Sequence, residues 1–262
     1  MKRFFPLLFA LLSVPALLSA REMVRLTRYD GQRIAGVSAS HMFEVVLVKS
    51  DATKAVVEID GELESYLRFE CKEDGVVRVG LNLPRDVQRR IERNNGWRNR
   101  TLKLTLYLPD FHTIELSDMA RLTSSSPFTA EQARIKVEDM AKITNLNLDA
   151  EIVTVKAEDM AGVNLTLWAD KATLKADDMA KINASGECRE AYAESNDMAR
   201  INANGLKAER ATLKAADMAK TSMYVSRWLY ARSSDMASID YTGDPAEIDL
   251  KTPRRTVYRV NP

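Results

Sequence analysis

The stretch DDMAKINASG, residues 177–186, contains the tripeptide Asp-Met-Ala, which decides the fold of this chain. The tripeptide occurs at seven aspartates, and successive copies are separated by steps of 21, 20, 19, 19, 20 and 18 residues. A period near 20 residues is typical of a solenoid, in which each repeat covers the apolar face of its neighbour. The seven aspartates are Asp118, Asp139, Asp159, Asp178, Asp197, Asp217 and Asp235.

Apolar and charged residues alternate on both sides of each aspartate. The positions two and four residues away are mostly apolar or small, and the second residue after the aspartate is always alanine. The positions three residues away are mostly Lys or Arg, as Lys175 and Lys181 show in TLKADDMAKINA, residues 173–184. Alternation with period two predicts strands, whereas a helix would need apolar residues at the third and fourth positions.

Each repeat is therefore expected to form two or three short strands joined by tight turns, wound as one coil of a parallel β-helix. The Leu-x-x-Leu-x-Leu frame of leucine-rich repeats is absent, and the Gly-rich calcium-binding nonapeptide unit is about half as long as this repeat. Coils stacked about 4.8 Å apart would place the seven tripeptides along a stripe of roughly 29 Å.

The chain divides into four segments. Residues 1–20, MKRFFPLLFALLSVPALLSA, are typical of a signal peptide, and no later apolar segment is long enough to span a membrane. Residues 21–110 alternate without the tripeptide and predict longer strands packed onto the coil, interrupted by a polar, Arg-rich loop at 84–100. Residues 111–250 form the repeat, and 251–262 a C-terminal tail. The expected location is the periplasm, the outer-membrane surface or the medium.

The composition excludes several classes of function. Lys and Arg number 38 and Asp and Glu 37, so no overall charge attracts nucleic acid. The two cysteines, Cys71 and Cys188, are too few for a disulfide-stapled domain, and two separate thiols are favoured over one bond between them. The two histidines, His41 and His112, fall in no nucleophile motif, and no phosphate-binding glycine loop is present. We predict no enzyme, no cofactor and no metal site.

The repeated aspartates are interpreted as corner residues. Asp tolerates unusual backbone conformations and its side chain bonds nearby N–H groups at turns, so one Asp per coil predicts a hydrogen-bonded ladder. A dry column of unpaired carboxylates would be unstable, since neighbours repel by about 3.5 kcal/mol at an effective dielectric of 20. Calcium could neutralise such a column, but the adjacent basic residues disfavour it.

The methionine that follows each aspartate can be placed in two ways. The alternation directs it outward, where it would form an apolar interaction stripe, but a corner can reverse that direction and place it in a core ladder. The inward or half-buried ladder is slightly favoured, because buried methionine is commoner. The seven residues are Met119, Met140, Met160, Met179, Met198, Met218 and Met236.

The Arg-rich loop is a second candidate interaction site, for an anionic ligand such as an acidic polysaccharide. A charge run of this kind is more often only solvated. Its candidate residues are Arg89, Arg90, Arg93, Trp97 and Arg98.

Four stretches resemble the family of auto-transporter adhesins with a GIN-type head domain. They are GVSASHMFEVVLVKS (36–50), VEIDGELESYLRFECKEDGVVRVGLNL (57–83), LKLTLYLPDFHTIELSDMARL (102–122) and SDMASIDYTGDPAEI (234–248). In the last stretch Tyr241, Gly243 and Pro245 carry the resemblance, and Asp235 stands where that family usually has glycine. The resemblance covers Gly36 to Leu250 and implies a right-handed parallel β-helix in a Gram-negative cell envelope, with no catalytic residues.

The leading functional hypothesis is a non-catalytic envelope or surface scaffold that binds an unknown protein or polysaccharide through a repetitive flat face. One alternative is a polysaccharide lyase or hydrolase on the same fold, which would require a deep groove with two carboxylates and a basic residue. Another is a structural module that associates with its own kind as a homo-oligomer, which exposed methionines on a dimer face would favour.

Overall fold

The computed structural model describes residues 22–93, 96–97, 100–251 and 256–260, so the expected signal peptide lies outside the described residues. The N-terminal strands are β1 (Met23–Arg28), β2 (Gly36–Ala39), β3 (Glu44–Lys49), β4 (Lys54–Asp60), β5 (Leu67–Cys71), β6 (Val76–Leu81) and β7 (Leu102–Leu108). The repeat strands are β8 (Thr113–Leu116), β9 (Arg121–Ser124), β10 (Phe128–Val137), β11 (Lys142–Asn145), β12 (Asn147–Ala157), β13 (Gly162–Ala176), β14 (Lys181–Ser195), β15 (Arg200–Ala215), β16 (Lys220–Ser233), β17 (Ser238–Thr242), β18 (Glu247–Leu250) and β19 (Val257–Arg259). The described helices are α1 (Gly61–Glu64) and α2 (Arg85–Arg93).

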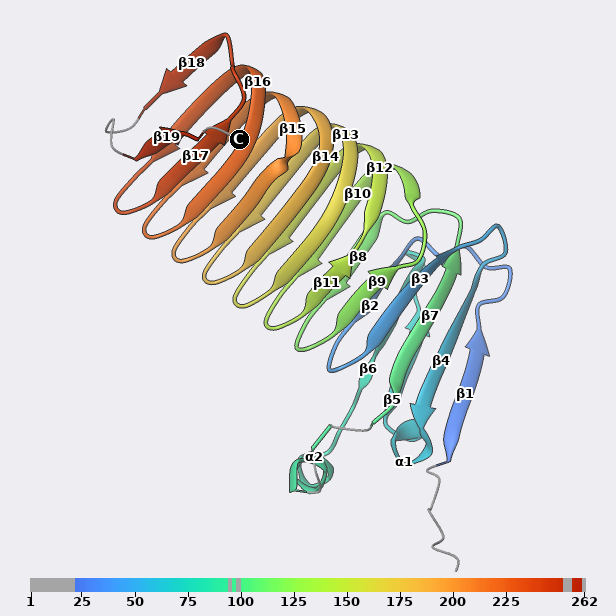
Figure 1. Cartoon of the computed structure of the whole chain (residues 1–262). Coiled ribbons are helices and arrows are strands. Elements are labelled where there is room, and N and C mark those ends of the chain that lie inside the picture. Colours follow the sequence, from blue (N-terminus) through green and yellow to red (C-terminus); the bar gives the residue numbers. More distant parts are fainter. Residues whose placement is uncertain (1–21, 94–95, 98–99, 252–255, 261–262) are drawn as a thin grey trace, which may run out of the picture.

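The repeat winds as a parallel β-solenoid of flattened coils, with the Asp-Met-Ala turns along one edge (Figure 1). Equivalent residues of successive coils pair directly. One such column contains, in order, Arg121, Lys142, Gly162, Lys181, Arg200, Lys220 and Ser238. The predicted stacking of equivalent side chains over one another is therefore confirmed.

The strands of the later coils are longer than the sequence predicts. Strands β13 to β16 run continuously for 14 to 16 residues around the far edge of the coil, where two or three short strands were expected. Within the segment assigned to a C-terminal tail, β19 pairs in parallel with β17 and extends the solenoid.

The core lies inside the coil, where the even positions of the alternation point. The alanine two residues after each aspartate is at most 1% exposed in all seven coils. Branched side chains lie two residues after these alanines and are also buried. Ile182 and Ile201 come from neighbouring coils and Ile239 from a later coil, and all three are fully buried. Since every coil covers the apolar face of the next, burial accumulates along the axis.

The N-terminal strands form further coils that extend the solenoid at its N-terminal end. Strands β2 and β3 pair in parallel with β8 and β9, and β6 and β7 pair in turn with β2 and β3. Strands β1, β4 and β7 form an antiparallel sheet that continues from this end, and β5 pairs antiparallel with β6.

Helix α2 connects β6 to β7, at the position where later coils have their Asp-Met-Ala turn, and it projects from that same edge (Figure 1). The expectation of a loop over 84–100 is wrong for Arg85–Arg93, which forms a helix of nine residues. Val87 and Ile91 lie four residues apart and are both buried, so the helix is held by one apolar face. Neither described helix is long and apolar enough to cross a bilayer.

Candidate functional site

The Asp-Met-Ala turn has the same backbone geometry in all seven coils. Each aspartate has a φ between 56° and 61°, which is uncommon for a residue other than glycine. The following alanine closes a β-turn, as in Asp177–Ala180, where the Ala180 N–H donates to the Asp177 carbonyl at 3.2 Å. Positive φ at the first central position is the type II′ pattern, in which glycine is usual. The interpretation of these aspartates as corner residues is thus supported by the backbone.

The predicted ladder of aspartate side-chain hydrogen bonds forms only at the N-terminal end of the column, and from Asp159 onward the carboxylates accept no hydrogen bond from a described residue. The Asp118 carboxylate accepts from the His41 N–H at 2.7 Å, and the Asp139 carboxylate accepts from the Asp118 N–H at 3.0 Å. The coils are also linked through the backbone, since the Met140 N–H donates to the Asp118 carbonyl at 2.8 Å, a contact that recurs at four later coils.

His41 and Met42 form an eighth turn of the same kind, which was not predicted from the sequence. His41 has a φ of 62°, and its carbonyl accepts from the Met119 N–H at 2.8 Å. The segment Ser-His-Met-Phe therefore occupies the place of Ser-Asp-Met-Ala one coil earlier. The shared Ser-x-Met spacing was the signal that could have identified it.

The methionines point away from the core, so the predicted inward ladder is wrong. Their exposed fractions run from 37% at Met119 to 75% at Met236. Each methionine stands at an odd position, beside a buried alanine, and keeps the outward direction of the flanking strands. The aspartate before it stands at an even position but is also exposed, because the strand alternation is interrupted at the turn. The seven methionines form an exposed line along the edge of the solenoid, which continues into Met42, a half-buried residue that packs against the core. The whole line is here called the Met ridge: Met42, Met119, Met140, Met160, Met179, Met198, Met218 and Met236.

Charged columns of opposite sign flank the Met ridge. On one side lie the seven exposed aspartates, here called the acidic column. On the other lies the basic column, three residues after the aspartates: Arg121, Lys142, Lys181, Arg200 and Lys220. All five basic residues are exposed.

The residues of the Arg-rich segment are only partly brought together. Arg89, Arg90 and Arg93 lie exposed on α2. Trp97 packs against the hydrophobic core, so it does not join them as an exposed aromatic side chain. Arg98 lies outside the described residues.

Neither cysteine is paired. Cys188 is buried and Cys71 is partly exposed, and both are free thiols. Burial raises the pKa of the Cys188 thiol to about 12. Within the described residues, no group of three or more His, Cys, Asp or Glu side chains is arranged to hold a metal ion.

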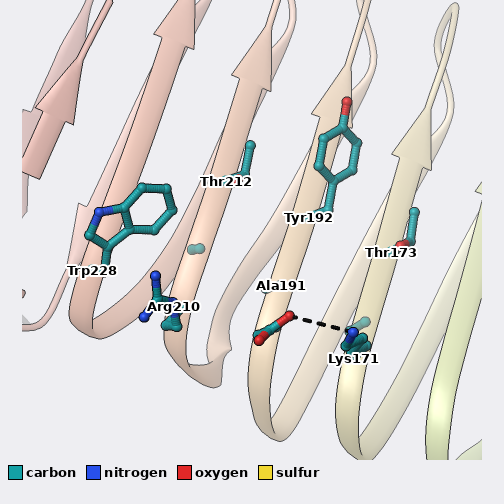
Figure 2. Close-up of a pocket in the computed structure, with 10 residues that line it drawn as sticks. Lys171, Thr173, Ala191, Tyr192, Arg210, Thr212 and Trp228 are labelled. Atoms are coloured by element: carbon teal, nitrogen blue, oxygen red, sulfur yellow. Dashed lines mark ion pairs between the residues drawn. The ribbon is translucent and has the colours of Figure 1, made fainter.

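A shallow groove of about 220 Å³ lies on the outer face of strands β13 to β16, in the strand segment that leads into the turn (Figure 2). Its aromatic side chains are Tyr192 and Trp228, which come from different coils. The remaining polar side chains that line the groove lie on the same outer face of these strands. We call it the aromatic groove and define it by Lys171, Thr173, Glu190, Tyr192, Arg210, Thr212 and Trp228.

Cationic side chains contact both aromatic rings of the groove. The Arg210 guanidinium lies 5.3 Å from the centre of the Trp228 ring, and Lys175 and Lys214 place their ammonium groups 5.5 and 5.1 Å from the Tyr192 ring. Such contacts hold the rings and the cations in fixed relative positions. Arg210 forms no ion pair with any residue that the structure describes. One cation in the groove therefore remains available to an anionic ligand.

The carboxylates of the groove face are already paired. Glu190 lies 3.9 Å from the Lys171 ammonium, and Glu194 lies 2.9 Å from that of Lys175. The Lys175 hydrogen bond lowers the pKa of Glu194, and the Tyr192 hydroxyl adds to this effect. A general acid needs the opposite shift, toward neutral pH. This arrangement suits binding better than proton transfer.

The aromatic groove was not predicted from the sequence. Tyr192 stands five residues before Asp197 and Trp228 seven before Asp235, so the alternation already placed both rings on the outer face. Three aligned coils bring Tyr192, Arg210 and Trp228 together, and that alignment was the missing information.

The family described as "Putative auto-transporter adhesin, head GIN domain" matches residues 35–245. Among solved structures, a putative adhesin from Parabacteroides merdae ATCC 43184 is similar at 14% identity, with a TM-score of 0.75 over 91% of this chain and 96% of that one. A putative adhesin from Parabacteroides distasonis ATCC 8503 is similar at 17% identity, with a TM-score of 0.76 over 92% and 98%. A putative lipid binding protein from the same organism is similar at 16% identity, with a TM-score of 0.71 over 90% and 96%. No curated protein sequence matches the chain.

Proposed function

Because the chain belongs to this family of head GIN domain proteins, we propose that it is a non-catalytic interaction scaffold of the cell envelope or cell surface. Its binding site is the aromatic groove, and its ligand is a glycan that carries carboxylate groups. The observation that carries this proposal is that Arg210 lies beside the Trp228 ring, at 5.3 Å, on the same sheet face as Tyr192 of the preceding coil (Figure 2).

The chemistry of the groove matches a sugar. The apolar C–H face of a pyranose ring can pack on an indole or phenol ring, while the Thr173 and Thr212 hydroxyls can bond sugar hydroxyls. The Arg210 guanidinium can form a charge-assisted pair with a uronic acid carboxylate. A shallow, open site of this size would accommodate one or two sugar units and bind them weakly. A repetitive surface gains strength from several such contacts at once.

A polysaccharide-degrading enzyme is disfavoured by the same geometry. The groove is shallow, its carboxylates are ion-paired, and the pKa of Glu194 is lowered. Incubation with a uronic acid polymer is therefore expected to give binding without any fall in chain length.

The test is calorimetric titration with oligogalacturonate, with neutral dextran oligomers as the comparison. Wild-type protein is expected to bind oligogalacturonate at least tenfold more tightly than dextran. Both Trp228→Ala and Arg210→Ala should weaken the binding at least tenfold. The matched control is Trp168→Ala, which removes a tryptophan that is 46% exposed and lies outside the groove. Equal loss in all three variants, or no binding of either glycan, contradicts the proposal.

A further inference from the structure

The charges beside the Met ridge are largely unpaired with other residues that the structure describes. Arg121, Lys142, Lys181 and Arg200 form no ion pair with a described residue, and Lys220 pairs only with Asp240, at 2.6 Å. Among the described residues, no Lys or Arg side chain lies within ion-pair distance of the seven aspartates, and the His41 ring lies 3.8 Å from the Asp118 carboxylate. The two columns are thus not neutralised across the ridge.

A second row of basic residues lies on the other side of the turn, three residues before the aspartates. Lys136, Lys156 and Lys175 of this row each pair with a glutamate of the same face, at 2.5, 2.6 and 2.9 Å. The other two, Lys214 and Arg232, form no ion pair with a described residue. Nearest-neighbour pairing is therefore available to this fold and is used on that face. Along the Met ridge, an exposed apolar line lies between unpaired charges of opposite sign.

We propose that the Met ridge is the contact surface for a second copy of this chain, with the two solenoid axes parallel. This inference concerns a surface separate from the aromatic groove and does not depend on the glycan proposal. It rests on the order of the three columns: acidic, Met, basic. A twofold axis parallel to the solenoid reverses that order in the second copy, so each Met faces the same Met and each acidic column faces a basic one.

The antiparallel arrangement has the opposite charge pattern. A twofold axis perpendicular to the solenoid keeps the order of the columns, which sets aspartate against aspartate and lysine against lysine. Like charges juxtaposed in an interface are destabilising, whereas facing opposite charges favour one orientation. In the parallel dimer, five coils present complementary pairs, such as Asp178 with Lys181 of the second copy. Both ridges share one coil spacing, and the seven exposed methionines therefore meet in register.

The size of the ridge indicates a weak dimer. The seven exposed methionines, at about 4.8 Å per coil, span roughly 29 Å, and the two charged columns lie three residue steps, about 10 Å, apart. That strip covers on the order of 300 Å² per copy, less than half of the roughly 800 Å² typical of a stable complex. Helix α2 projects from the same edge at the N-terminal end, so the closest contact is expected toward the central and C-terminal coils.

The first test is the oligomeric state of purified protein, measured by sedimentation velocity from 1 µM to 500 µM. A reversible monomer–dimer equilibrium that weakens with added NaCl is expected. Lys181→Glu with Arg200→Glu should weaken dimerisation at least tenfold, because glutamates then face the partner's aspartates. Adding Asp178→Asn and Asp197→Asn should recover at least part of that loss, since asparagine removes the repulsion and tolerates the positive φ. The matched control is Lys49→Glu with Arg134→Glu, which makes the same charge change at two exposed residues away from the ridge that form no ion pair with a described residue. A monomer at every concentration overturns the proposal, as does equal weakening by the control.

The second test is the orientation of the dimer. Met218→Cys is made in a Cys71→Ser, Cys188→Ala background, and its oxidation should yield covalent dimers. In a mixture with a size-tagged Met140→Cys variant, only disulfides between identical variants are expected. Predominant Met140→Cys to Met218→Cys cross-links would show the antiparallel arrangement and refute ours. Lys207→Cys, exposed on another face, is the control and should stay monomeric.

Discussion

The N–H of His41 donates a 2.7 Å hydrogen bond to the carboxylate of Asp118, although the two residues are 77 positions apart in the sequence. The contact joins the last turn without an aspartate to the first turn with one. His41 keeps the positive φ of the column, so the N-terminal coil is continuous with the repeat in backbone geometry. The repeat therefore begins one coil earlier than its tripeptide.

The positive φ of the corner predicts a particular order of stabilities at Asp178. Asp178→Val should lower the free energy of unfolding by about 1–2 kcal/mol, because a β-branched residue is strained at a φ of 61°. Asp178→Gly should change it by less than about 0.5 kcal/mol, since glycine adopts this conformation freely. Urea unfolding monitored by circular dichroism measures both.

Asp118→Gly is the informative comparison for that pair. Like Asp178→Gly, it removes the strain of a positive φ at the corner, but it also removes the carboxylate that accepts the hydrogen bond from the His41 N–H. We expect it to lower the free energy of unfolding by about 1 kcal/mol more than Asp178→Gly does. Equal stability of the two glycine variants would show that the hydrogen bond contributes nothing.

Gly186 should be intolerant of any side chain. It has a φ of +109°, and a Cβ atom there would lie 2.0 Å from the Leu167 carbonyl oxygen of the neighbouring coil. We expect Gly186→Ala to lower stability by about 3 kcal/mol. Gly31→Ala separates the two causes, because Gly31 has a φ of +69° with nothing within 4 Å, and should cost only about 1 kcal/mol.

The two thiols should react at very different rates. The raised pKa of the Cys188 thiol, about 12, leaves almost no thiolate at pH 8, and the residue is buried. Iodoacetamide should therefore modify Cys71 in the folded protein and Cys188 only after unfolding. The pKa of Cys71 is also raised, mainly by burial, so its labelling should be slower than that of a free peptide thiol. Mass spectrometry of tryptic peptides after timed labelling measures both rates.

Acid should weaken the solenoid through its paired glutamates. The Lys175 hydrogen bond lowers the pKa of Glu194 below its ordinary 4.5, and a lowered pKa gives stability that is present above 4.5 and is lost as pH falls through the folded value. Glu194→Gln should reduce the stability difference between pH 7 and pH 3 by up to about 1 kcal/mol, the upper range for a partly exposed pair. Urea midpoints at the two pH values provide the measurement. A Glu151→Gln control, at an exposed position, should leave the difference unchanged.

The sequence alone predicted the solenoid, the corner aspartates and the outward parity of odd positions, because all three follow from local spacing. The prediction of inward methionines was wrong because the general tendency of methionine to be buried was given more weight than the outward direction of odd positions. Helix α2 was missed because its two buried residues, Val87 and Ile91, give a weak periodic signal within a run of arginines. The aromatic groove depends on alignment between coils of unequal length. The pairing of β15 with β16 shifts register between Ala208 and Arg210, a shift that no tripeptide marks.

Each coil is one winding of the chain and contacts mainly the coils before and after it. The length of the solenoid can therefore change without a change of fold. Excision of residues 178–196 would remove one full winding and rejoin Asp177 to Asp197, the next aspartate of the series. The molecule would shorten by about 4.8 Å while its edge stayed continuous. Length is thus an adjustable dimension of this protein, variable in whole increments.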